Sequence, residues 1–468
     1  MIKKTFIAVR LFFLMLLCST FFLTACGGGG GGSTSSSDET KVKSPPYLGR
    51  KYIGSNRCKH CHESKGDEWK KTKHASAFSD ISKNNKTCLQ CHTTGYDKKI
   101  KNGGYDENPE KGLENVGCES CHKAAGRYSP HYTSRSSARK IQFKQTLLSL
   151  QATTCGKCHT KTISGSQSKG QYDQWVNSKH SKSLKTLKGH KESEDSCLEC
   201  HSVDAIYYKG SVSIKRASNP ITCVGCHDPH SSKNKYQLRT TGNATLPGSG
   251  VKYAAENAAI CFTCHNDQIE DVDKAVDSGE VPAHNQAQLL VGTGGYDFGE
   301  TIDNSFHSTF ADKCLTCHGY STPSSGEDGH NTIGSHTFMV SDDDGNELLS
   351  ACGQCHSGLT SFDRTARGDY DGDGSTEGIQ SEVDGLLTLL KSKILESGNV
   401  TEDTDSFGRT FFKFSSSATD NEKRAAFNWL FVNNDKSHGV HNAGYAVKLL
   451  QLSYKNLTGS DVPGADIR

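Results

Sequence analysis

The chain has 468 residues, of which only 33% are apolar, a small share for a globular protein of this length. Such a composition predicts that polypeptide alone does not fill the core. Lysine and arginine number 54 against 52 aspartates and glutamates. The chain therefore lacks the basic excess that nucleic-acid-binding proteins use, and nucleic acid is not an expected partner.

Residues 1–26 have the pattern of an export signal, with basic residues before an apolar run at residues 11–23. The segment ends in Leu-Thr-Ala-Cys26, which is similar to the lipobox of bacterial lipoproteins. We therefore expect an exported lipoprotein, anchored by lipidated Cys26 at the outer membrane, on the cell surface or on the periplasmic face. An ordinary signal peptide with a chance cysteine is the alternative. Residues 27–49, which begin with glycine and serine runs, are predicted to be a flexible linker.

The pattern Cys-x-x-Cys-His then occurs nine times between residues 58 and 356. It predicts nine covalent c-type haems, because two thiols three positions apart reach the two vinyl groups of a porphyrin and the adjacent imidazole binds the iron. Zinc is the alternative, but a zinc ribbon needs two cysteine pairs per metal and no histidine after each pair. The predicted thioether residues are Cys58, Cys61, Cys88, Cys91, Cys118, Cys121, Cys155, Cys158, Cys197, Cys200, Cys223, Cys226, Cys261, Cys264, Cys314, Cys317, Cys352 and Cys355. The predicted proximal iron ligands are His62, His92, His122, His159, His201, His227, His265, His318 and His356.

This interpretation uses every cysteine of the chain. Of 20 cysteines, Cys18 leaves with the signal, Cys26 takes lipid and the other 18 fill the haem sites, so none is left for a disulfide. Nine porphyrins would supply the missing hydrophobic surface, and their propionates would make the whole protein acidic.

The spacing between motifs indicates an internal repeat. A tryptophan stands five residues before a histidine after both the first and the fourth motif, at Trp69 and Trp175. We predict a six-haem region made of two three-haem units at residues 50–240, a three-haem region at 241–357 and a haem-free helical cap at 358–468.

The predicted cap begins with an acidic loop. Its carboxylates match the first nine positions of a calcium-binding EF-hand loop, and a glycine permits the turn at position six. Position twelve is Gln380 in place of the usual glutamate, so the site should be weak unless Glu382 reaches in. A solvated acidic turn is the alternative. The possible Ca²⁺ ligands are Asp369, Asp371, Asp373 and Glu377.

Three helices are predicted after this loop. The first places one apolar stripe on a single face, formed by Val383, Leu386, Leu387, Leu390 and Ile394. Thr419 and Glu422 form a capping box that opens the second helix. The third helix is predicted from about residue 442 to about residue 457.

Short motifs resemble a known family of multihaem cytochromes. Tyr52-Ile-Gly-Ser before the first motif, Gly117-Cys118-Glu in the third, Cys226-His227-Asp-Pro-His230, Ser335-His336-Thr-Phe and Gly439-Val-His441-Asn carry the resemblance. They are similar to pieces of the tetrahaem cytochromes of ammonia oxidisers and their relatives, which include hydroxylamine oxidoreductase and multihaem nitrite reductase. The resemblance implies a mainly α fold with extensive loops, organised around stacked haems, to which the helices predicted above add a helical C-terminal cap.

Histidine is the expected second axial ligand of most irons. Only one methionine, Met339, follows the signal, whereas 21 histidines leave 12 for nine sixth positions. For the ninth position His190 is preferred over His330, His438 and His60. The other eight are assigned from their positions in the related family or in the internal repeat. The predicted distal ligands are therefore His74, His131, His180, His190, His230, His284, His307, His336 and His441.

Two functions follow from these patterns. The first is electron transfer through nine bis-histidine haems, with redox proteins as partners, extracellular electron acceptors as a possibility, and membrane attachment through Cys26. The second is a multihaem reductase of nitrite, hydroxylamine or tetrathionate, which needs an iron with an open position. All nine motifs end in histidine and histidines are in surplus, so the electron carrier is favoured over the enzyme. A subunit of a haem-bearing filament or outer-membrane complex is a variant of the first function.

Overall fold

The computed structural model describes residues 52–81, 85–97, 101–109, 112–125, 148–161, 170–208 and 212–468. They lie in one compact unit, which spans residues 49–468. The predictions for the export signal, Cys26, the linker and His131 concern residues outside the described ranges. No described helix combines the length and the apolar character that crossing a membrane requires.

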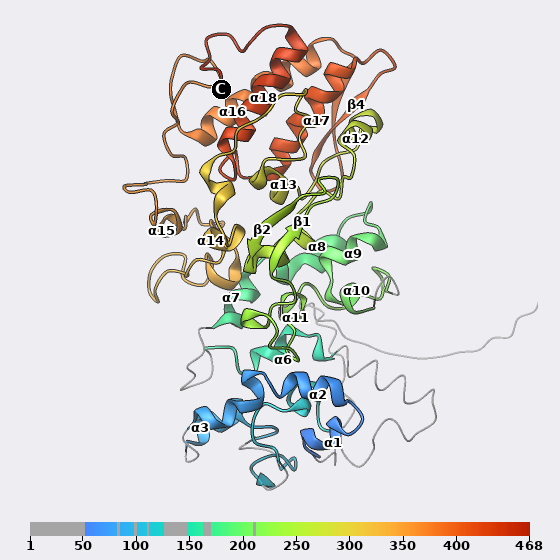
Figure 1. The fold of residues 1–468 in the computed structure, drawn as a ribbon, viewed down its shortest axis with the longest axis vertical. Helices are drawn as coiled ribbons and strands as arrows, with labels where there is room; N and C mark the ends of the chain where they lie inside the picture. The colour runs from blue at the N-terminus through green and yellow to red at the C-terminus, as the bar shows by residue number, and fades with distance from the viewer. Residues whose placement is uncertain are drawn as a thin grey trace, which may run out of the picture. The chain divides into compact units, whose positions relative to one another are not determined.

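The haem-motif part of the chain folds into short helices joined by loops (Figure 1). Most of these helices are one or two turns long, so none of them buries a wide apolar face. Up to residue 237 they are α1 (Ser55–Lys59), α2 (Glu63–Trp69), η1 (Lys73–Asp80), α3 (Lys86–His92), α4 (Cys118–His122), α6 (Ala152–Gly156), α7 (Gln171–Asn177), η3 (His180–Lys182), α8 (Ser183–Lys188), η4 (Asp195–Cys197), α9 (Leu198–His201), α10 (Val203–Tyr208), α11 (Cys223–Cys226) and η5 (Lys235–Gln237).

The following part adds a two-stranded antiparallel sheet, in which Ala244 lies opposite Tyr253. Two of its helices stop at glycines with positive φ, Gly279 (71°) and Gly292 (72°), a conformation that glycine adopts without strain. The elements are β1 (Gly242–Thr245), β2 (Lys252–Glu256), η6 (Asn257–Thr263), α12 (Val272–Ser278), α13 (Gln286–Val291), η7 (Phe306–Thr309), α14 (Cys314–His318), η8 (Ser335–Thr337) and α15 (Leu349–Cys352).

The C-terminal part contains the longest helices, α16 (Ile379–Glu396), α17 (Asp420–Asp435) and α18 (Ala443–Thr458). The predicted apolar stripe is buried along α16, which confirms that helix. The capping box is also confirmed, since Thr419 Oγ1 accepts the Glu422 N–H at 3.2 Å and the Glu422 carboxylate accepts the Thr419 N–H at 2.6 Å. A hairpin of β3 (Val400–Thr404) and β4 (Thr410–Phe414) joins α16 to α17.

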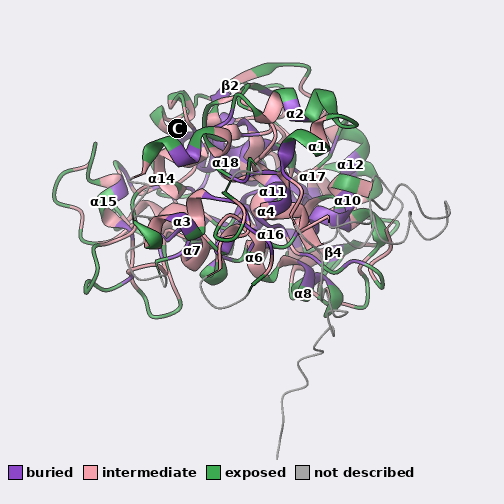
Figure 2. Cartoon of the chain, turned by 90° about the horizontal axis from the view of Figure 1, so that it is seen from below, coloured by how far each residue is buried: buried purple, intermediate pink, exposed green. Residues whose placement is uncertain are grey.

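The largest apolar core lies among these C-terminal helices, which pack together as Figure 1 shows. This core also includes Leu289 of α13. Helices α12 and α13 precede the predicted boundary at residue 358, yet both pack against α17. Between the haem motifs the apolar clusters are small, for example Ile333, Leu348 and Ala351. Figure 2 shows buried residues towards the interior and exposed residues along the peripheral loops. The fold is mainly helical with little sheet, as the sequence predicts.

Candidate haem-ligand sites

Each Cys-x-x-Cys-His motif folds as a helical turn. In the first motif the His62 N–H donates to the Cys58 carbonyl at 2.9 Å, and the same bond recurs at 2.9 Å between His265 and Cys261. Residues four positions apart lie on one face of a helix, so the first thiol and the imidazole of a motif point to the same side. All 18 motif cysteines are partly or fully exposed, and none of these 18 forms a disulfide. This arrangement fits thioether attachment of a porphyrin next to its iron ligand. We number the haem sites 1 to 9 in the order of the motifs.

Seven motif histidines face an imidazole from another part of the chain. Their ring centres are 5.9 Å to 6.4 Å apart. An iron between two imidazoles needs about 6 Å, since each metal–nitrogen bond is about 2 Å and the ring centre lies roughly 1 Å behind the nitrogen. The seven gaps therefore fit bis-histidine haem. The pairs are His122 with His230, His159 with His74, His201 with His284, His227 with His336, His265 with His180, His318 with His441 and His356 with His307.

Seven of the nine predicted distal histidines are thus brought to named haem sites, namely sites 3 to 9. His190 lies elsewhere, stacked on Phe407 with ring centres 3.9 Å apart and its Nδ1 2.8 Å from the Ser406 carbonyl. Among the described residues, the seven pairs cover the motif histidines of sites 3 to 9. His92 Nδ1 lies 2.5 Å from the Ala77 carbonyl, which leaves its Nε2 to face a haem.

Hydrogen bonds orient several of the paired rings. Nδ1 of His227, His318 and His307 contacts the carbonyl oxygens of Tyr236, Phe338 and Val440 at 2.7 Å to 2.8 Å. A ring held by its Nδ1–H presents Nε2 to the metal, so these backbone acceptors fix both tautomer and direction.

Burial keeps most paired imidazoles neutral. Desolvation disfavours the imidazolium, and it lowers the pKa of six of these rings to about 4. Neutral imidazole is the form that binds a metal, so the rings are ready to ligate at neutral pH. The six are His74, His122, His180, His284, His318 and His336.

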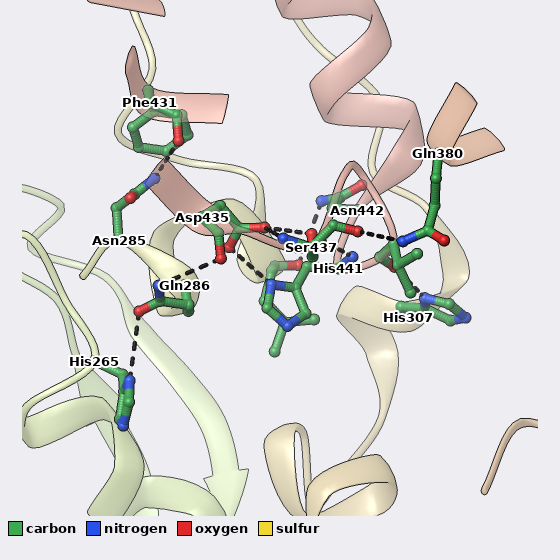
Figure 3. Close-up of polar contacts among 12 residues, drawn as sticks. His265, Asn285, Gln286, His307, Gln380, Phe431, Asp435, Ser437, His441 and Asn442 are labelled. Carbon is green, nitrogen blue, oxygen red and sulfur yellow. Dashed lines mark hydrogen bonds and ion pairs between the residues drawn. The ribbon is translucent and has the colours of Figure 1, made fainter. Parts of the chain in front are cut away.

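His441 has a different environment (Figure 3). Burial opposes a charge on its ring, but the Asp435 carboxylate, 2.7 Å from Nδ1, outweighs that effect and raises the pKa of His441. Sequence reasoning did not single out Asp435. The only signal is an acidic residue six positions before a predicted ligand, which is a common occurrence in any sequence.

Side chains from different motifs also meet, and they reveal which haem sites are neighbours. Once haem is attached these sulfurs are thioethers, so their contacts stand for adjacent haem edges. Five pairs of cysteine side chains interact across motifs. They are Cys58 with Cys118 (sites 1 and 3), Cys91 with Cys158 (sites 2 and 4), Cys155 with Cys223 (sites 4 and 6), Cys200 with Cys264 (sites 5 and 7) and Cys261 with Cys314 (sites 7 and 8). Cys121 also lies near Cys155, Cys226 near Cys264 and Cys317 near Cys352, so that sites 3 and 4, 6 and 7, and 8 and 9 are close together. With a haem at every site, the main row would run 1, 3, 4, 6, 7, 8, 9, with site 2 beside 4 and site 5 beside 7.

The acidic loop brings together the predicted calcium ligands. Carboxylate oxygens of Asp369, Asp371 and Asp373 lie within 4.8 Å of one another, and so do those of Asp371, Glu377 and Glu382. Glu382 is fully buried in the first turn of α16, where it accepts the N–H of Tyr370 at 2.7 Å. It therefore reaches the loop, as a functional site would require. Burial, followed by repulsion from neighbouring carboxylates, raises the pKa of Asp371, an unfavourable state that a bound cation would relieve.

Calcium binding to this loop stays a prediction and has a direct test. At calcium concentrations 10 to 100 times Kd, we expect the chelator-treated protein to gain about 1.5 to 3 kcal/mol in free energy of unfolding, without a change in haem spectra. Asp371→Ala should abolish the gain, whereas Asp344→Ala, in an exposed acidic turn, should keep it. Thermal unfolding and bound-calcium analysis measure both. Equal behaviour of the two variants would show that the loop is only a turn.

Comparison with known proteins agrees with haem attachment at the Cys-x-x-Cys-His motifs. Residues 57–123 match the family model of cytochrome c554 and c-prime, and residues 217–270 match a doubled CXXCH motif. Cytochrome c-554 of Nitrosomonas europaea is 34% identical over 97 residues, a match that covers 16% of this chain and 38% of that protein.

Two solved structures share the fold. Outer cell wall cytochrome OcwA aligns with a TM-score of 0.56 at 19% identity, over 87% of this chain and 100% of its own. An undecahaem cytochrome from the S-layer of Carboxydothermus ferrireducens aligns with a TM-score of 0.51 at 19% identity, over 88% of this chain and 70% of its own. With its Cys-x-x-Cys-His motifs, facing imidazoles and this fold, the chain is a multihaem c-type cytochrome, and its residues 57–123 resemble cytochrome c554 and c-prime.

Proposed function

We propose that the protein is an electron conduit that carries electrons through nine covalent c-type haems, most of them with two histidine ligands. The observation that supports this most strongly is the set of seven facing imidazole pairs at a separation that fits iron. An iron with two protein ligands has no position for substrate, so it exchanges electrons only. Haem supplies the redox chemistry, and the chain holds and spaces the sites.

The continuous row of sites supports transfer over a distance. Electrons would enter and leave at sites that end the row or its branches, where redox proteins or extracellular acceptors can approach. The two structural relatives are described as cell-wall and S-layer cytochromes, which favours a surface location here as well. In this proposal a lipid at Cys26 attaches the protein to the outer membrane. A filament or outer-membrane complex would use the same row.

The spin state of the haems tests the conduit. We expect almost only low-spin ferric signals in the oxidised protein, little carbon monoxide binding after reduction, and slow or no turnover of nitrite or hydroxylamine. Electron paramagnetic resonance and steady-state assays measure these properties. Fast turnover, together with a high-spin signal that shifts when nitrite is added, would contradict the proposal.

A second candidate function, a reductase, is favoured by one observation at site 2. Among the residues that the structure describes, His92 belongs to none of the facing imidazole pairs. An iron held there by His92 alone would keep an open position for nitrite, hydroxylamine or a similar oxidant. In that case the high-spin signal should disappear with the haem in Cys88→Ala/Cys91→Ala and survive in Cys197→Ala/Cys200→Ala, which lacks only the site 5 haem.

A further inference from the structure

The two ligands at site 8 have unequal hydrogen-bond partners. His318 Nδ1 contacts a neutral backbone carbonyl, that of Phe338, at 2.8 Å. His441 Nδ1 contacts Asp435 Oδ1 at 2.7 Å (Figure 3). The Asp435 side chain is fully shielded from solvent. Among the seven pairs in the described residues, the other carboxylate contact is His230 with Asp228, which is longer, 3.3 Å, and partly exposed.

Local structure holds the Asp435 carboxylate in place. Asp435 is the last residue of α17, and Lys436 follows with a positive φ of 65°, which turns the chain back. The Ser437 N–H then donates to Asp435 Oδ2 at 3.2 Å, and the Ser437 hydroxyl donates to the same oxygen. One carboxylate oxygen thus faces His441 while the other is held by Ser437.

The position of Asp435 gives its charge a strong effect on the imidazole. The C-terminal end of a helix carries partial negative charge, so α17 does not stabilise the carboxylate. Solvent does not reach the side chain either, and charges interact strongly where water is excluded. The Nδ1–H of His441 is therefore the main group on which the Oδ1 charge acts.

We propose that Asp435 is a redox-tuning residue that lowers the reduction potential of the haem held between His318 and His441. A carboxylate on the outer nitrogen makes the ring a more basic ligand. A more basic ligand stabilises ferric over ferrous iron, and hydrogen bonding of this kind is one of the means by which a protein sets haem potential. Asp435 acts through His441 and touches no iron itself.

This inference rests on the proposed function in one respect, because it requires a haem at site 8. Site 8 lies between sites 7 and 9 in the row. A lowered potential there makes the ferrous state of site 8 sparsely populated, so electrons pass this site without accumulating on it. It separates the electrons held on sites 1 to 7 from those held on site 9.

Asp435→Asn in the full-length holoprotein tests the inference. Asparagine keeps the shape of the side chain and removes its charge. At a fixed ambient potential we expect the ferric-to-ferrous ratio of one haem to fall about tenfold, which corresponds to a rise of 59 mV in its one-electron reduction potential. The reduction potentials of the other haems should not change. A redox titration followed by electron paramagnetic resonance resolves the low-spin component that moves.

Ser437→Ala gives a second variant with the opposite expected sign. Without the Ser437 hydroxyl, the Asp435 carboxylate becomes a stronger acceptor towards His441, so the ferric-to-ferrous ratio of the same component should rise. A merely structural disturbance would not reverse its direction between the two variants. If Asp435→Asn fails to mature, the direction of the shift in Ser437→Ala decides the test.

Two control variants test whether the shift in potential is specific to Asp435. Asp384→Asn removes a carboxylate 2.7 Å from Nδ1 of His438, an exposed pair that is not at a haem site, and should move no component. Asp228→Asn, next to His230, should move a different component by less than Asp435→Asn does. The inference fails if Asp435→Asn shifts no component or shifts all of them equally. A wild-type protein without the low-spin signals would contradict the proposed function instead.

Discussion

Protein made without haem attachment is expected to lose its structure between residues 52 and 357. The apolar clusters between the motifs are small, and only 33% of the chain is apolar. Each iron would also join two distant segments through a ligand pair, so removing haem removes cross-links as well as core. We expect loss of most helical circular dichroism from this part and rapid proteolysis of it.

Export of the full chain in a host without haem-attachment enzymes provides the sample, and the holoprotein is the reference. Cys58→Ala/Cys61→Ala, which removes only the haem at the end of the row, should leave the rest of the protein protected. A haem-free chain that resists protease as well as the holoprotein does would show that polypeptide packing suffices.

The second large effect is expected in the C-terminal core. Ile394 of α16 is completely buried in that core. Ile394→Ala should lower the free energy of unfolding by about 2 to 5 kcal/mol, because it removes buried apolar surface and leaves a cavity. Thermal or denaturant unfolding of the holoprotein, followed by circular dichroism, measures the change.

Ile467→Ala is the matched control, since Ile467 is 46% exposed near the C-terminus. Its effect should stay within about 0.5 kcal/mol. The haem spectra of both variants should equal those of the wild type, because neither residue is next to a paired imidazole. Equal stability of the two variants would mean that α16 contributes little to the core.

Local patterns in the sequence predict the local parts of the fold. The haem motifs, the apolar stripe of α16 and the capping box at Thr419 each depend on residues a few positions apart, and the structure contains all of them. The hairpin of β3 and β4 was not predicted, although Phe412 points inward from β4 and Asp405 and Gly408 mark the turn. Two short strands give a weak signal because their stability comes from packing on the helices.

The sequence does not predict which histidines meet. His441 follows its partner His318 by more than a hundred residues, and nothing near either one specifies the other. His190 illustrates the limit, because the sequence places it only ten residues after His180, another predicted ligand. The structure stacks it on Phe407, from a turn more than two hundred residues away. Such contacts depend on the complete fold.

The pairing also crosses the predicted repeat. His74, from the first three-haem unit, faces His159 of the second, and His230, from the second unit, faces His122 of the first. With haems in place the two predicted units would therefore exchange axial ligands, much as swapped domains exchange an element. A chain shortened by one unit would leave an iron of the surviving unit with a missing ligand. In an exported chain that emerges from its N-terminus, site 3 stays incomplete until the second unit has crossed the membrane. Gain or loss of a repeat in evolution would thus require new axial ligands as well as a new motif.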